Sequence, residues 1–313
     1  MALILLIPLS ISPTYPLPEN MNSHPRTLLI TGSSSMIGDF LLPALTRRGF
    51  SVQALSRRPG INPEETSGEP GRLHWYTVDL TQKDLVLPEG ADTLIHLAPL
   101  WLLPPLIPAL STRGIKRVLA FGSTSVLTKM DSASAHERWL MENLTRAETD
   151  LAQRCADDGI HWTIFRPTLV YHLGRDKNVS VIARFIRRFG FFPLVGEGTG
   201  LRQPVHAEDL AGACLAALDA PATYGQSYNL SGGETLSYRA MVTRLFTHYH
   251  KPPRIVTLPL SWLRLGLSAL ALWPAYRYLT PDMADRINRD MCFDTSQAVQ
   301  DFGYQARGFL QEG

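Results

Sequence analysis

The sequence is poor in cysteine and carries almost no net charge. Its 3 cysteines, Cys155, Cys214 and Cys292, lie far apart and form no Cys-x-x-Cys pair. This argues against a disulfide framework or a metal site and favours a reducing, cytoplasmic compartment. The 30 Lys and Arg residues nearly balance the 28 Asp and Glu residues, leaving a formal net charge of +2. We therefore expect no nucleic-acid partner, because a dedicated nucleic-acid binder carries a stronger basic surface.

A long apolar run is also lacking at the N-terminus. The apolar stretch 2–11 is too short to span a bilayer, and no Lys or Arg precedes it. We interpret residues 1–20 as a disordered or spurious extension, with Met21 as a sensible start. The alternative is a signal peptide, which would mean an exported protein.

Residues 27–38 contain the pattern around which the chain is organised. An apolar, β-prone run at 27–30 is followed by Gly32, by three serines at 33–35, and by Gly38. Residues 39–48 then have the composition of a helix that packs closely against the strand. A strand, a glycine turn and a helix N-terminus together predict a site for a phosphate or pyrophosphate. Ser35 stands where the full G-x-x-G-x-x-G pattern has its middle glycine, so other motifs must support this interpretation.

Two arginines follow the second predicted strand, at 51–55. In a dinucleotide-binding fold an acid at this place binds the ribose 2′-hydroxyl, whereas an arginine accommodates a 2′-phosphate. Arg57 and Arg58, with no acid beside them, favour NADP(H), with NAD(H) as the other candidate; a solvated basic turn is the alternative. Asp79, after the third predicted strand, either accepts from the adenine amino group or caps the next turn.

Strands and helices alternate along the first half of the chain. Further strands are predicted at 74–78, 92–98, 117–121 and 161–165, a long helix at 134–156, and an irregular or kinked, proline-containing helix at 100–110. His96 is interpreted as a core histidine rather than a catalyst. This alternation predicts an α/β protein with a doubly wound parallel sheet.

Several modest motifs occur in an order typical of one family. They are Thr31-Gly32…Gly38, Asp79-Leu80, Phe121-Gly-Ser-Thr-Ser-Val126, Arg166-Pro-Thr-Leu-Val-Tyr171, Arg202-Gln-Pro-Val-His-Ala-Glu-Asp209 and Tyr228-Asn-Leu-Ser-Gly-Gly233. Together they resemble the extended or atypical short-chain dehydrogenase/reductases of the NAD-dependent epimerase/dehydratase family. The resemblance implies a Rossmann domain, expected at 21–172, and a smaller C-terminal substrate lobe, expected at 173–313 with some segments returning to the first domain.

The resemblance also implies roles for single residues. We expect the pyrophosphate at Gly32, Ser33, Ser35, Met36, Ile37 and Gly38, the adenine at Asp79 and Leu80, and the nicotinamide side at Ala98 and Pro167. Ser123, or Thr124 beside it, matches the family's catalytic hydroxyl. Arg202 matches an arginine that often faces substrate phosphates, whereas His206 and Asp209 are expected to hold their loop and cap a helix at 210–218.

The family's Tyr-x-x-x-Lys is absent. Alignment of Arg146-Ala-Glu148 with the family's continuation places Leu140 and Leu144 at the Tyr and Lys positions, and leucine cannot transfer a proton. His136 or Glu137 could substitute, although an acid near a helix start is usually a favourable partner of the helix dipole. Tyr171 could point into the cleft, although the resemblance implies a mainly structural role for it. Two hypotheses follow: an NADP(H)-binding oxidoreductase or epimerase acting on a nucleotide sugar or other phosphate-bearing substrate, or a non-catalytic dinucleotide-binding sensor or assembly protein.

Two stretches of the second lobe suggest further contacts. Residues 177–192 predict an amphipathic helix whose arginines, Arg184 among them, either contact a diphosphate or anionic head group of the substrate or form a solvated basic face. Residues 258–279 are apolar and aromatic but interrupted, which fits peripheral membrane contact, packing on the lobe, or packing on a second subunit in a homodimer.

Overall fold

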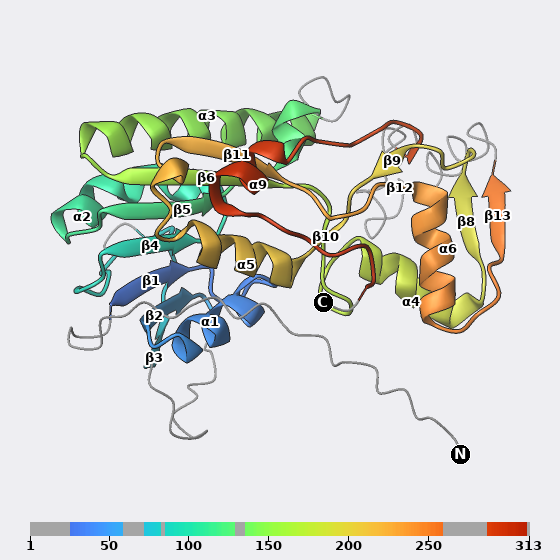
Figure 1. The fold of residues 1–313 in the computed structure, drawn as a ribbon, viewed down its shortest axis with the longest axis horizontal. Helices are drawn as coiled ribbons and strands as arrows, with labels where there is room; N and C mark the ends of the chain where they lie inside the picture. The colour runs from blue at the N-terminus through green and yellow to red at the C-terminus, as the bar shows by residue number, and fades with distance from the viewer. Residues whose placement is uncertain (1–25, 59–71, 83–84, 129–134, 259–286, 312–313) are drawn as a thin grey trace, which may run out of the picture.

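The computed structural model describes residues 26–58, 72–82, 85–128, 135–258 and 287–311. A seven-stranded parallel sheet forms its larger domain, with strand order β11-β6-β5-β4-β1-β2-β3 (Figure 1). The strands are β1 (Thr27–Thr31), β2 (Ser51–Ser56), β3 (Leu73–Thr77), β4 (Thr93–His96), β5 (Arg117–Phe121), β6 (His161–Pro167) and β11 (Gln226–Leu230). The doubly wound sheet predicted from the sequence is confirmed, and the expected extension 1–20 lies outside the described residues.

Helices cover both faces of this sheet, as Figure 1 shows. One face packs against α1 (Gly38–Arg47), α5 (Ala207–Ala217) and α9 (Ser296–Phe302), and the other against α2 (Ile107–Thr112) and α3 (Ala135–Asp157). The central strands are apolar on both sides because neither face meets water, which is typical of parallel sheets. Prolines break the chain before α2 into the short turns η2 (Leu100–Leu102) and η3 (Pro104–Leu106), confirming the irregular helix predicted at 100–110.

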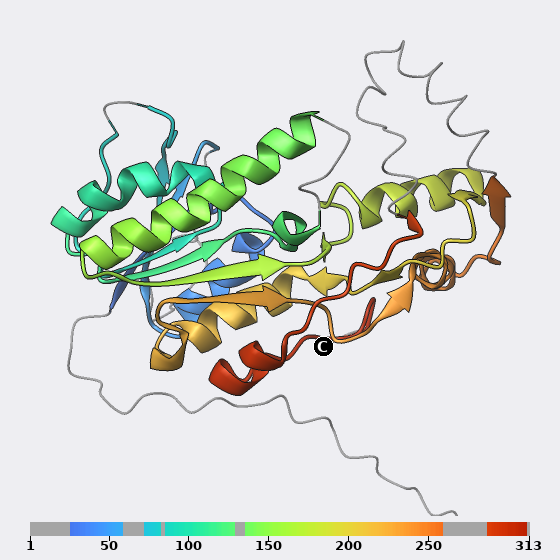
Figure 2. The ribbon, with the colours of Figure 1, turned by 90° about the horizontal axis from the view of Figure 1, so that it is seen from above.

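A smaller lobe has its own apolar core. It contains α4 (Val179–Phe189) and α6 (Tyr238–His248), with β8 (Phe192–Val195) parallel to β13 (Ile255–Leu258) (Figure 2). Two short pairs of β-strands lie between the lobe and the seven-stranded sheet. They are β7 (Val170–Tyr171) with β10 (Val205–His206), and β9 (Leu201–Arg202) with β12 (Leu236–Ser237). The helix predicted at 177–192 is too long at its C-terminal end, because Gly190 takes φ 73° and ends α4 before β8 begins.

The C-terminal segment 303–311 runs from α9 to the small lobe. Tyr304 is buried in the core of the sheet and donates from its hydroxyl to Ser231 O at 2.8 Å. Phe309 is fully buried in the core of the lobe. This segment, which we call the C-terminal strap, therefore joins the two cores.

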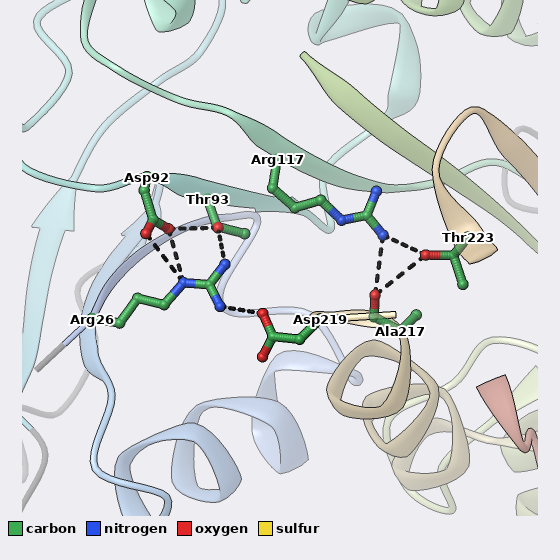
Figure 3. Close-up of polar contacts among 7 residues, drawn as sticks. All are labelled: Arg26, Asp92, Thr93, Arg117, Ala217, Asp219 and Thr223. Atoms are coloured by element: carbon green, nitrogen blue, oxygen red, sulfur yellow. Dashed lines mark hydrogen bonds and ion pairs between the residues drawn. The ribbon is translucent and has the colours of Figure 1, made fainter. Parts of the chain in front are cut away.

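Polar side chains close the amino-terminal edge of the sheet (Figure 3). Buried Arg117 donates to Ala217 O at 3.1 Å and to Thr223 Oγ1 at 2.7 Å, while Arg26 pairs with Asp92 and Asp219. These contacts hold the C-terminal end of α5 and the turn after it against β5. The opposite edge, where the strands have their carboxyl ends, is where open α/β sheets bind ligands. No helix among the described residues is both long and apolar enough to cross a bilayer.

Candidate functional site

The turn after β1 requires both of its glycines. Gly32 has φ 72°, and a Cβ there would lie 2.5 Å from the backbone nitrogen of Ala98. A Cβ on Gly38 would lie 2.0 Å from the carbonyl oxygen of Ser33. These distances are too short for any side chain, so glycine at both positions brings the ends of β1 and β4 and the start of α1 together.

The serines of this turn shape it from inside. Ser33 is buried, and its hydroxyl donates to Ile30 O at 2.9 Å. Ser35, which replaces the middle glycine, accepts a hydrogen bond from Gly38 N–H at 3.1 Å. Its hydroxyl therefore caps the start of α1, where the sequence predicted only a small side chain.

The same turn presents backbone donors at the helix N-terminus. Among the described residues, the N–H groups of Met36 and Ile37 donate to no acceptor. Unpaired N–H groups and the positive end of a helix dipole form an anion site. The turn therefore fits a pyrophosphate, since its two glycines allow the tight backbone path and its N–H donors are available.

The end of β2 lies beside this cradle. Ser56 Oγ is 3.1 Å from Ser34 Oγ and accepts from Arg58 N–H at 3.0 Å. The side chains of Arg57 and Arg58 are exposed, so both are accessible to an anion. Contact of the two arginines with a 2′-phosphate stays a prediction.

Asp79 caps its own turn. Its carboxylate accepts from Thr81 N–H at 3.0 Å and from Thr81 Oγ1 at 2.8 Å, and these bonds lower the pKa of Asp79. The turn-capping interpretation is thus supported. Contact of Asp79 and half-buried Leu80 with an adenine stays a prediction.

His96 is a core histidine, as predicted. It is fully buried, with Nδ1 2.7 Å from Thr31 Oγ1 and Nε2 3.1 Å from Pro99 O. Because a carbonyl can only accept, Nε2 carries the proton and Nδ1 accepts from the threonine. Burial lowers the pKa of His96 to about 4, so the neutral ring fixes the ends of β1 and β4 beside Ala98.

The hydroxyl groups after β5 are not equivalent. Ser123 is partly exposed, and its Oγ accepts from Ser125 N–H at 3.2 Å; among the described residues its hydroxyl donates to no acceptor. Thr124 is buried and donates to Pro167 O at 3.1 Å. The structure therefore brings Thr124 together with Pro167 and leaves Ser123 as the better catalytic candidate.

Helix α3 carries Leu140 and Leu144, the two residues expected at the family's Tyr and Lys positions. Leu144 is buried and Leu140 packs beside it in the core between α3 and the sheet. One turn further, buried Glu148 accepts from Arg166 Nε at 3.0 Å on each carboxylate oxygen. This helix therefore contributes packing and an ion pair beneath the Ser123 loop.

Tyr171 belongs to the apolar core of the lobe. It is 2% exposed, its hydroxyl accepts from Leu310 N–H at 3.1 Å, and burial raises its pKa. Burial and the bond to the C-terminal strap support the structural role of Tyr171 rather than the catalytic one. His136 is exposed and stacks on Trp139, with 6.0 Å between ring centroids.

The arginines predicted to bind substrate lie in different settings. Arg202 is buried, and its Nη1 donates at 2.7 Å to the carbonyl oxygens of Leu201 and Arg289. Arg184 is exposed on α4 and donates to Ser180 O of the same helix at 3.3 Å. Their contact with substrate stays a prediction, and Arg202 would have to exchange backbone acceptors for it.

The two residues expected to hold the loop before α5 have separate roles. His206 caps α5 by accepting from Glu208 N–H at 3.3 Å, as predicted. Capping by Asp209 is wrong: its carboxylate accepts from Arg307 N–H at 3.0 Å and from Arg307 Nε at 2.7 Å. Asp209 therefore binds the C-terminal strap.

One arginine at the cradle was not predicted from the sequence. Arg175, five residues after β7 begins, donates from Nη2 to Ser34 O at 2.9 Å and from Nη1 to the carboxylate of Asp39 in the first turn of α1. His172 Nδ1 lies 3.6 Å from the same carboxylate. The one signal in the sequence was Asp39. A carboxylate beside a phosphate site is unfavourable unless a cation balances its charge, so a basic partner could have been expected.

A parallel sheet with a glycine cradle after β1 and a hydroxyl loop after β5 defines a Rossmann protein of the short-chain dehydrogenase/reductase class. The model of the NAD-dependent epimerase/dehydratase family matches residues 28–100 and 105–231, and the chain belongs to this family.

Known relatives agree with this assignment. The chain is 31% identical to protein y4nG of Sinorhizobium fredii, over 90% of this chain and 75% of y4nG. It is 24% identical to 2-alkyl-3-oxoalkanoate reductase of Stenotrophomonas maltophilia, over 91% and 96% of the two chains. The solved structure of MoeE5 in complex with UDP-glucuronic acid and NAD has the same fold, with a TM-score of 0.66 at 21% identity over 90% of this chain and 94% of MoeE5.

Proposed function

We propose that this protein is an NADP(H)-binding oxidoreductase or epimerase that acts in the cytoplasm on a nucleotide sugar or another phosphate-bearing small molecule. The observation that carries the proposal is the glycine cradle after β1, where the N–H groups of Met36 and Ile37 have no acceptor among the described residues. Family membership and the NAD and UDP-sugar bound to MoeE5 support it. NAD(H) is the second candidate cofactor.

Different residues around the cradle would bind different parts of the dinucleotide. The turn from Gly32 to Gly38 would hold the pyrophosphate, Arg57 and Arg58 the 2′-phosphate, and Ala98 and Pro167 the nicotinamide side. A bound nicotinamide supplies hydride transfer. Ser123, whose hydroxyl proton is available, would donate to a substrate oxygen and polarise it, while Arg202 and Arg184 are the candidates for the substrate's anionic groups.

The cofactor proposal is tested by titrating the protein with NADPH and NADH and following nicotinamide fluorescence. We expect NADPH to bind more tightly, and the variant Arg57→Ala/Arg58→Ala to lose this preference while it still binds NADH. Arg254→Ala, an exposed arginine of the small lobe, is the matched control. Tighter binding of NADH by the unaltered protein would contradict the assignment of the two arginines.

A second candidate function is favoured by the packing of α3. With Leu140 and Leu144 in an apolar core, the chain has the features of a non-catalytic dinucleotide sensor or assembly protein, for which a homodimer is one arrangement. Turnover distinguishes the two: epimerase or reductase activity abolished by Ser123→Ala supports the enzyme. Dinucleotide binding without turnover of UDP-sugars supports the sensor.

A further inference from the structure

The outer side of α4 is unusual for a surface helix. Its inner positions, including Val179, Ile182 and Ile186, are buried in the lobe core. The side that faces away from this core carries Val181, which is 48% exposed, and Phe189, which is 53% exposed. Phe191, just past the helix, is 38% exposed. Exposed large apolar side chains that gather on one surface mark an interaction site.

The aromatic side chains form one continuous cluster. The ring centroid of Phe185 lies 4.6 Å from that of Phe189, 5.5 Å from Phe191 and 5.8 Å from Phe192. Phe192 belongs to β8 and joins the lobe core. The exposed rings are therefore held in place from beneath and need no rearrangement to meet a partner.

Basic side chains border this cluster. Arg187 and Arg188, both exposed, occupy the last turn of α4. The guanidinium of Arg188 lies 5.5 Å from the ring of Phe189, and that of Arg187 lies 5.5 Å from the ring of Tyr249. In the part of the chain that the structure describes, neither arginine forms an ion pair with a carboxylate. The face is therefore cationic as well as apolar.

We propose that this α4 face, made of Val181, Arg187, Arg188, Phe189 and Phe191, docks on the surface of an anionic lipid bilayer. Phenylalanine rings enter the boundary between head groups and acyl chains, and arginines pair with lipid phosphates. An acidic bilayer matches both properties of the face at once. In Figures 1 and 2 helix α4 lies in the lobe, remote from α2, so docking through α4 leaves the helices around the sheet free.

The surface differs from the stretch 258–279, of which only Leu258 lies within the described residues. It also does not depend on the proposed dinucleotide site. The two proposals can therefore fail separately, because vesicle binding and NADPH binding are measured in different assays.

Sedimentation of the full chain with vesicles tests the proposal. We expect binding to vesicles of 70% phosphatidylcholine and 30% phosphatidylglycerol, and much weaker binding to phosphatidylcholine alone. Arg187→Gln/Arg188→Gln should lower binding about tenfold or more, since each charge near an anionic surface contributes on the order of 1 kcal/mol. Phe189→Ser/Phe191→Ser should lower it by a similar factor, because the variant loses the apolar area that enters the bilayer. Only the arginine variant should also lose most of the dependence on salt.

The matched control is Val299→Ser, because Val299 is 50% exposed on α9, away from α4. It should bind vesicles as the unaltered protein does, and circular dichroism should show that every variant is folded. Equal binding to both vesicle types, or no binding to either, would overturn the proposal. Concentration-dependent dimers that disappear in Phe189→Ser/Phe191→Ser, without vesicle binding, would assign the face to a second copy instead.

Discussion

Replacement of Arg175 should weaken dinucleotide binding through Asp39 rather than through a direct contact. Arg175 pairs with Asp39 in the first turn of α1 and holds Ser34 O at 2.9 Å, so it balances a carboxylate next to the phosphate cradle. In Arg175→Ala this carboxylate stays charged and repels the incoming pyrophosphate.

The expected loss of binding free energy depends on how far solvent screens the charge of Asp39. Two unit charges about 4 Å apart interact by about 4 kcal/mol at an effective dielectric constant near 20. The side chains of Arg175 and Asp39 are 44% and 28% exposed, so solvent screening reduces the effect to about 1 kcal/mol. This corresponds to roughly a fivefold increase in the Kd for NADPH.

Comparison of a single and a double variant by isothermal titration calorimetry tests this reasoning. Arg175→Ala should raise the Kd, and Asp39→Asn/Arg175→Ala should return it close to the original value, because the repelling charge is gone. Arg239→Ala removes a comparable exposed ion pair with Glu197 in the small lobe and should change nothing. The reasoning fails if the double variant binds as weakly as Arg175→Ala; absence of binding by the unaltered protein would instead refute the proposed cofactor.

Three further predictions concern stability, each measured by urea denaturation. Gly38→Ala should lower the free energy of unfolding by about 2–3 kcal/mol, because its Cβ has no room, whereas Gly212→Ala, with open space around it, should not. His96 has a native pKa of about 4, below its unfolded value of 6.5, so its contribution to stability is complete above pH 6.5 and is lost as the pH falls toward 4. Between pH 7 and 4.5 the free energy of unfolding should fall by about 2–3 kcal/mol more in the unaltered protein than in His96→Asn. Equal losses in the two proteins would refute this. Glu148→Gln should lower the free energy of unfolding by about 3 kcal/mol, because Arg166 loses its carboxylate partner. Glu148→Leu/Arg166→Met should lower it by less, since no buried charge is left unpaired. A larger loss in the double variant would contradict the ion-pair account.

Local patterns in the sequence predict the sheet well. The β1 strand, both glycines of the cradle and the proline-broken stretch before α2 are each defined by neighbouring residues, so their structure follows from local propensity. The end of α4 was misjudged because the apolar pattern continues through Phe191 and Phe192 into β8, and only the left-handed Gly190 marks the boundary.

Contacts between residues far apart in the chain could not be predicted from the sequence. Arg175 and Asp39 are 136 positions apart, and Asp209 and Arg307 are 98 apart. Neither pair belongs to a periodic pattern, and a charged residue on a loop has many partners within reach. The sequence could therefore predict that the loop before α5 is held, but not that Asp209 holds it by binding the chain's last segment.

The C-terminal strap limits how the protein can admit its ligands. Tyr304 is anchored among the helices under the sheet and Phe309 among those of the lobe, so a wide swing of the lobe would pull one ring out of its core. Exposing a buried aromatic ring costs several kcal/mol. Ligand entry should then proceed by a slight rocking about the short tether 305–308, and proteolytic cleavage at this tether would release the lobe from that restraint.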